Sequence, residues 1–121
     1  MMKKFVIASL GLFLLAGVSP LVRAADEGAK TVTGEVIDSF CYVGMGARGA
    51  SHKQCGVDCA KKGMSVGLLE NGTDKIYVLL PDKDKTPLPD GVINKMGSTA
   101  TVTGKSYTSG GVSFLMVSSV R

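Results

Sequence analysis

The sequence predicts a mainly β protein: a small, five-stranded, partly open barrel with one helix inserted after the first strand. Three observations lead to this fold class. About five short runs rich in β-branched or alternating residues are separated by turns that contain glycine or asparagine. One segment alone carries both the start and the stop signals of a helix. The chain is also short, and a short all-β chain buries its strand edges economically by curling into a barrel.

The first 24 residues have the pattern of a signal peptide. Lys3 and Lys4 precede an apolar run over residues 5–18, and Val22 and Ala24 are small residues at the positions that signal peptidase reads. The apolar run is shorter than the roughly 20 residues that span a bilayer, so a retained anchor is the weaker interpretation. We therefore expect residues 1–24 to be a signal peptide, and residues 25–121 to be a single domain in the periplasm or secreted.

Charge argues against nucleic acid as a partner. The full chain has a formal net charge of +4, but three of its basic residues, Lys3, Lys4 and Arg23, lie in the expected signal peptide. A domain with almost no net charge and no Trp lacks the basic face that binds phosphates. We also expect no membrane association once the signal peptide is removed.

The first strand is expected at residues 31–38, where Val32 and Val36 fall on one side of an alternating pattern. The segment 41–46 contains two glycines and is expected to be a loop. Ser51 and Gln54 have the spacing of a capping box, which predicts a helix from His52 to Lys62, closed by Gly63.

The remaining elements are strands. Residues 66–70 and 75–80 predict a hairpin with Asn71-Gly72 at its turn. A proline-bearing connection over residues 81–90 and a short helical turn near residues 92–95 follow. Residues 98–104 and 112–120 predict the last two strands, joined near Gly110 and Gly111.

Two resemblances accompany these patterns. The strand segments at the two ends, TVTGEVID and ATVTGK with FLMVSSV, resemble small exported OB-like domains of bacteria. In the usual OB order the helix follows the third strand, whereas here the predicted helix follows the first. The His-x-x-Cys-x-x-x-Cys segment, with Cys41 upstream, is similar to a group of small exported bacterial proteins of unestablished function, which implies export and a shared cluster but supplies no activity.

The chemistry of the chain is concentrated in its single His and its three Cys. His52, Cys55 and Cys59 fall within an arc of roughly 60° on the predicted helix, because offsets of three and seven residues return near the starting direction. Cys41 lies on the segment that leads from the first strand toward this helix. Three thiolates and one imidazole suit Zn(II) or, in an export compartment, Cu(I), so Cys41, His52, Cys55 and Cys59 are the candidate metal ligands. Met45 or Met64 could add a thioether.

Two alternatives stay open. A disulfide from Cys41 to Cys55 or to Cys59 would stabilise a small secreted domain and leave one thiol over. That remaining thiol, with Cys55 near a helix start, would also suit a thiol-redox or haem-linked role. The signatures Cys-x-x-Cys and Cys-x-x-Cys-His are both missing from the sequence.

Catalysis is the less favoured function class. Asp38, Asp58 and Asp74 are scattered and are expected to be solvated or to cap helices, and no Gly-x-Ser-x-Gly turn exposes a nucleophile. We expect a binding domain that presents its cluster to another exported protein, with a disulfide-stabilised interaction module as the alternative. The oligomeric state stays open, since an unpaired thiol could join two chains.

Overall fold

The computed structural model of this chain describes Gly17 and residues 28–121. The expected signal peptide and its cleavage site lie outside this part, apart from Gly17. Within the described part, no helix is both long enough and apolar enough to cross a membrane.

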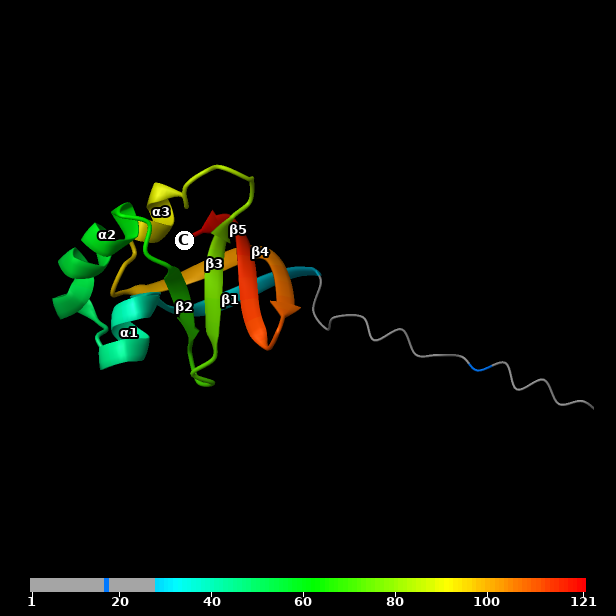
Figure 1. The fold of residues 1–121 in the computed structure, drawn as a ribbon, viewed down its shortest axis with the longest axis horizontal. Coiled ribbons are helices and arrows are strands. Elements are labelled where there is room, and N and C mark those ends of the chain that lie inside the picture. Colours follow the sequence, from blue (N-terminus) through cyan, green and yellow to red (C-terminus); the bar gives the residue numbers. More distant parts are fainter. Residues whose placement is uncertain (1–16, 18–27) are drawn as a thin grey trace, which may run out of the picture.

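Five strands form a closed barrel in the order β1-β2-β3-β5-β4 (Figure 1). All neighbouring pairs are antiparallel except β3 and β5, which run parallel and complete the barrel wall. This order confirms the mainly β, OB-like class, and the β3–β5 pairing closes the barrel where we expected it to be partly open. The strands are β1 (Gly28–Asp38), β2 (Val66–Glu70), β3 (Ile76–Pro81), β4 (Thr99–Ser109) and β5 (Val112–Val120).

The barrel interior is filled by alternate residues of the strands, as the period of two requires. Val36, Leu68, Val102 and Leu115 are fully buried and come from four different strands. The other members of the same buried core are Val32, Val66, Tyr77, Leu79, Val92, Met96, Ala100 and Val117.

Close backbone packing fixes two strand pairs. A Cβ atom at Gly34 would lie too close to the carbonyl group of Leu69, and one at Gly104 would meet the carbonyl of Met116. Gly104 also adjoins the register shift between β4 and β5. Glycine at these two positions therefore lets neighbouring strands approach closely in a small barrel.

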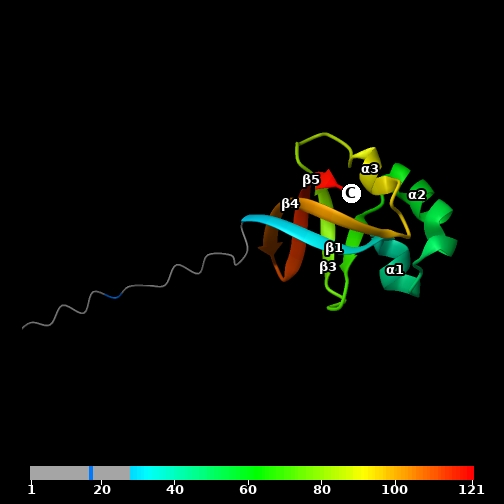
Figure 2. The ribbon, with the colours of Figure 1, turned by 180° about the vertical axis from the view of Figure 1, so that it is seen from behind.

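The helices lie between strands. Both α1 (Ser39–Met45) and α2 (Lys53–Lys61), joined by the short 3₁₀ turn Ala50–His52, connect β1 to β2, and the single turn α3 (Asp90–Ile93) lies between β3 and β4. In both views α1 and α2 lie together at one end of the barrel, away from the hairpin of β4 and β5 (Figures 1 and 2). The α3 turn thus occupies the place where an OB helix is usual, and the helices after β1 are an insertion.

The expected loop at residues 41–46 is wrong, because the structure has the helix α1 there. Asp38 caps its start by accepting hydrogen bonds from the backbone N–H groups of Phe40 and Cys41. Gly46, at φ 69°, ends it in the left-handed conformation. The glycines therefore do not prevent a helix: one lies inside it and the other terminates it.

The expected helix over residues 52–62 is confirmed as α2, but its capping box is not. The N-cap position is His52, without a capping side chain, and the Gln54 side chain donates to Asp58 one turn ahead. A 3₁₀ turn containing Ser51 leads into the helix, so Ser51 is not at its cap. Gly63 adopts φ 89°, as expected of the residue that closes the helix.

A glycine on α2 determines how closely this helix approaches the barrel end. A Cβ atom at Gly56 would lie 2.6 Å from Cγ of Met96, and Gly56 is the only buried residue of α2. Met96 is itself buried and forms a bridge with Val36 of β1. The Gly56–Met96 contact therefore seats α2 against the segment that closes the barrel end.

The remaining strands and turns expected from the sequence are present in the structure. The hairpin of β2 and β3, the short helical turn and the last two strands are all present, the turn beginning at Asp90 and β4 extending to Ser109. Gly72, Gly110 and Gly111 all have positive φ at the hairpin turns.

Candidate metal centre

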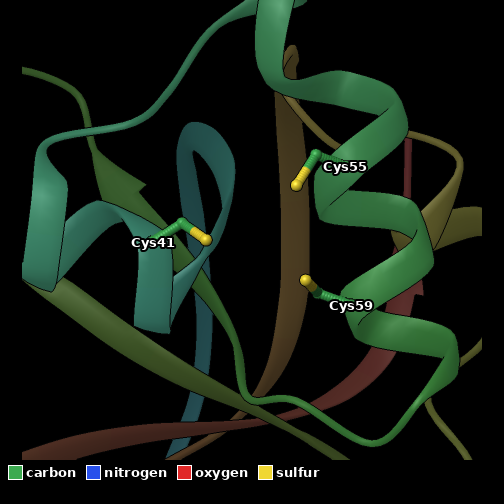
Figure 3. Close-up of side chains that lie close together, drawn as sticks. All are labelled: Cys41, Cys55 and Cys59. Carbon is green, nitrogen blue, oxygen red and sulfur yellow. The ribbon is translucent and has the colours of Figure 1, made fainter.

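The three cysteine sulfurs lie together between α1 and α2. Cys41 comes from α1, and Cys55 and Cys59 come from successive turns of α2. Their Sγ atoms all lie within 4.8 Å of one another. Figure 3 shows the three side chains pointing into the same space from the two facing helices. The expectation that Cys41 folds toward the helix face of Cys55 and Cys59 is therefore confirmed.

The three thiols differ in exposure. Cys41 is buried, Cys59 is partly buried and Cys55 is exposed, and all three are free rather than joined in a disulfide. The cluster thus reaches the surface of the protein at Cys55, which we call its opening.

Asp38 is the member of the site that sequence reasoning missed. Its side chain is 1% exposed, and its Oδ1 accepts hydrogen bonds from the backbone N–H groups of Phe40 at 3.1 Å and Cys41 at 3.4 Å. The expectation of a capping role is correct, but this carboxylate is buried rather than solvated. As the N-cap of α1, Asp38 also orients the helix turn that carries Cys41.

His52 lies beside Asp38 and Cys41. A ligand atom from each of these three residues lies within 4.8 Å of the other two, and His52 Nε2 is 3.8 Å from Asp38 Oδ2. The structure therefore contains two groups of candidate ligands: the three cysteines, and Asp38 with Cys41 and His52. Cys41 belongs to both groups. The sequence placed His52 on the face of Cys55 and Cys59, whereas the 3₁₀ turn before α2 brings it next to the end of β1.

Two atoms at this place are buried and unsatisfied. Asp38 Oδ2 and His52 Nε2 are both inaccessible to solvent, and neither has a hydrogen-bond partner among the described residues. A buried polar atom without a partner costs roughly 1–3 kcal/mol of desolvation free energy. A ligand that bound both atoms would remove this cost.

The Asp38 carboxylate strongly influences the neighbouring thiols. Its interaction with the Cys59 thiol, together with burial, raises the pKa of Cys59 to about 11. The same two causes raise the pKa of Cys41. Burial alone would raise the pKa of Asp38, but the interactions with the Cys41 and Cys59 thiols and the amide of Cys41 outweigh it and lower the pKa. In the protein without metal, these two thiols are thus held in their protonated form at neutral pH.

The connection between α1 and α2 is fixed to β1 by Glu35. This carboxylate accepts hydrogen bonds from Arg48 Nη2 at 3.1 Å and from the Gly49 backbone N–H at 3.0 Å. Gly97, at φ 74°, lies against the Gly49 carbonyl, where any Cβ atom would collide. Together these contacts hold the segment that carries His52 at a defined place over the end of the barrel.

The outer face of α1 is apolar. Phe40 is 65% exposed, and Val43, Met45 and Met64 are also exposed. Phe40, Val43 and Met64 line a shallow groove of ≈ 500 Å³ next to α1. The methionines expected as extra ligands therefore lie at the surface, and Met64 belongs to this groove.

Comparison of the chain with models of protein families, with curated proteins and with solved structures gave no match.

Proposed function

We propose that this protein is a metal-binding domain that holds one soft or borderline metal ion, Zn(II) or Cu(I), between the thiolates of Cys41, Cys55 and Cys59. The observation that carries the proposal is the convergence of the three Sγ atoms within 4.8 Å from two helices. Thiolates are the preferred ligands of Cu(I) and common ligands of Zn(II). His52, expected from the sequence as the fourth ligand, lies close to Cys41 and Asp38 rather than among all three sulfurs, so the fourth position of this ion is left for another ligand.

Two features of the structure support a metal over a disulfide. All three thiols converge, whereas a disulfide uses two and would leave the third beside a bond that it could attack. In addition, Gly56, Gly97 and Glu35 seat the helix and the connecting loop by contacts that do not depend on any bridge. These contacts position the three sulfurs without a disulfide.

The exposure of Cys55 supports exchange of the ion rather than permanent retention. Structural zinc sites are closed, whereas sites that act on a further ligand keep a position open. We propose that the domain presents its ion to another exported protein, with Cys55 as the thiolate at the opening.

Metal titration of the reduced protein tests the proposal. Full-length protein, purified under reducing and oxygen-free conditions, is titrated with Zn(II) and separately with Cu(I), and bound metal and free thiols are counted. At least one tightly bound ion that protects all three thiols from alkylation is expected. One free thiol and no bound metal in protein taken from an oxidising compartment would support the disulfide-stabilised module instead.

We further propose export to the periplasm or the exterior, on the basis of the N-terminal pattern. The mass of the protein recovered from the exporting host tests this. We expect the mature N-terminus at Ala25; an intact Met1 in the recovered protein would contradict it.

A further inference from the structure

We propose that Asp38, Cys41 and His52 form a second metal position, so that two divalent ions share the thiolate of Cys41. This inference rests on the proposed function, since the first ion lies among the three thiolates. The two ligand groups have Cys41 in common, and each group by itself has ligand atoms within 4.8 Å of one another. The thiolate of Cys41 could therefore bind one ion of each group and bridge the two ions.

The unsatisfied atoms of Asp38 and His52 are the independent observation. Oδ2 and Nε2 are buried, lie 3.8 Å apart, and have no hydrogen bond of good geometry in the described part of the chain. The groups that interact with the Asp38 carboxylate here are the Cys41 and Cys59 thiols, whose protons a bound metal ion would displace. This separation is too long for a hydrogen bond between them. Two ligands of one tetrahedral zinc ion, each bound at about 2.0–2.1 Å, lie about 3.3 Å apart. A shift of about half an ångström would thus satisfy both atoms with one ion.

The surrounding contacts hold both atoms in place for this role. The other carboxylate oxygen of Asp38 accepts the backbone N–H groups at the start of α1, so Oδ2 alone is left for a ligand. The loop before His52 is fixed by Glu35 through the amide of Gly49. An oxygen, a nitrogen and a sulfur form a borderline donor set, which favours Zn(II) over Cu(I) at this position.

Charge balance is compatible with two ions. Metal binding displaces the thiol protons, so the three thiolates and the ionised Asp38 together carry four negative charges within a small, partly buried volume. Two Zn(II) ions neutralise the site, and a bridging thiolate is compatible with the separation of about 3.5–4 Å that is usual for paired metal ions.

The zinc stoichiometry of reduced, full-length protein tests the inference by native mass spectrometry. We expect two ions for the wild type, and one ion for each of Asp38→Asn and His52→Gln. Asn retains the capping ability of Asp38, so α1 should persist in the first variant. Asp58→Asn is the matched control on α2, because Asp58 is exposed and bonded to Gln54, and it should keep two ions.

The outcomes separate this inference from the proposed function. A single ion in the wild type would overturn the second position and leave the proposed function standing, as would a second ion that persists in both variants. Absence of any bound ion would overturn both.

Cobalt substitution provides a test that needs no variant. A thiolate bridge couples two Co(II) ions magnetically, so the electron paramagnetic resonance signal per cobalt should fall when the second equivalent binds. A signal that doubles on the second equivalent would show two unconnected ions and overturn the shared thiolate.

Discussion

Asp38 Oδ2 lies 3.8 Å from His52 Nε2, and both atoms are buried without a hydrogen-bond partner in the described residues. The same carboxylate caps α1 through its other oxygen and raises the pKa values of the Cys41 and Cys59 thiols. One side chain thus links the helix start, the protonation of the sulfurs and the imidazole.

Replacement of Cys59 by Ser should weaken zinc binding by at least about 100-fold. Loss of a residue that only hydrogen-bonds to a metal ligand typically weakens metal binding by about 10- to 100-fold, and loss of the ligand itself should have a larger effect. Competition with a chromophoric chelator measures the change. Gln54→Ala, on the same helix, removes only the bond to Asp58 and should leave the affinity within about threefold of the wild type. Equal affinities of the wild type and Cys59→Ser would remove Cys59 from the site.

The metal-free protein should lose stability between about pH 9 and pH 11. The pKa of Cys59 rises from 9.0 to about 11 in the folded state, so folding favours the protonated thiol. This contribution is fully present below pH 9, where Cys59 is protonated in both states, and is lost as pH rises through 11. Thermal unfolding of the reduced apoprotein across this range measures it, with Cys59→Ser as the control, which should show a shallower decline. An equal or steeper decline in the control would contradict the raised pKa of Cys59.

Asp38→Asn should increase the reactivity of Cys59 toward an alkylating reagent in the metal-free protein. The variant removes the negative charge that keeps the proton on sulfur, so the pKa of Cys59 falls and the thiolate fraction at pH 8 rises. Peptide mass spectrometry after timed labelling measures the rate at each cysteine. An unchanged rate at Cys59 would mean that Asp38 does not control this thiol.

The substitution Gly56→Ala should destabilise the protein by about 1–3 kcal/mol, because the added methyl group would overlap with Met96. Chemical denaturation measures the free energy of unfolding. The double variant with Met96→Ala should be less destabilised than the sum of the two single changes, since the smaller side chain removes the overlap. Strict additivity would show that the two residues do not pack against each other.

The substitution Glu35→Gln should loosen the segment between α1 and α2. It weakens the charge-assisted hydrogen bonds from Arg48 and from the Gly49 amide. The free energy needed to open this segment locally should therefore fall by about 1–2 kcal/mol. Hydrogen exchange at the Gly49 amide should accelerate by about tenfold, while amides in the barrel core such as that of Val102 exchange as before. Uniform acceleration through the barrel would indicate global rather than local loss of stability.

Much of the fold follows from local sequence patterns. The alternation around Val32 and Val36 and the Asn71-Gly72 turn predicted the strands and a hairpin, because both signals depend on near neighbours in the sequence. The parallel pairing of β3 with β5 is non-local, and no local pattern reports it. The helix α1 was missed because its start depends on the buried Asp38 and its end on Gly46, and together these outweigh the low helix propensity of glycine.

The candidate site was predicted only in part. Helical spacing placed Cys55 and Cys59 on one face, and the structure confirms that they meet Cys41. The position of His52 depends on a 3₁₀ turn that precedes α2, which the capping-box pattern did not reveal. Asp38 ends the predicted first strand and directly precedes Ser39 and Phe40. An Asp at the end of a strand is a typical helix N-cap, and this was the signal that could have placed it beside Cys41.

The most direct test of the three-thiolate site is X-ray absorption spectroscopy of reduced protein loaded with one equivalent of Zn(II). We expect a first shell dominated by sulfur at about 2.3 Å, with three sulfur neighbours per zinc. A first shell of only nitrogen and oxygen at about 2.0 Å would contradict a site made by Cys41, Cys55 and Cys59.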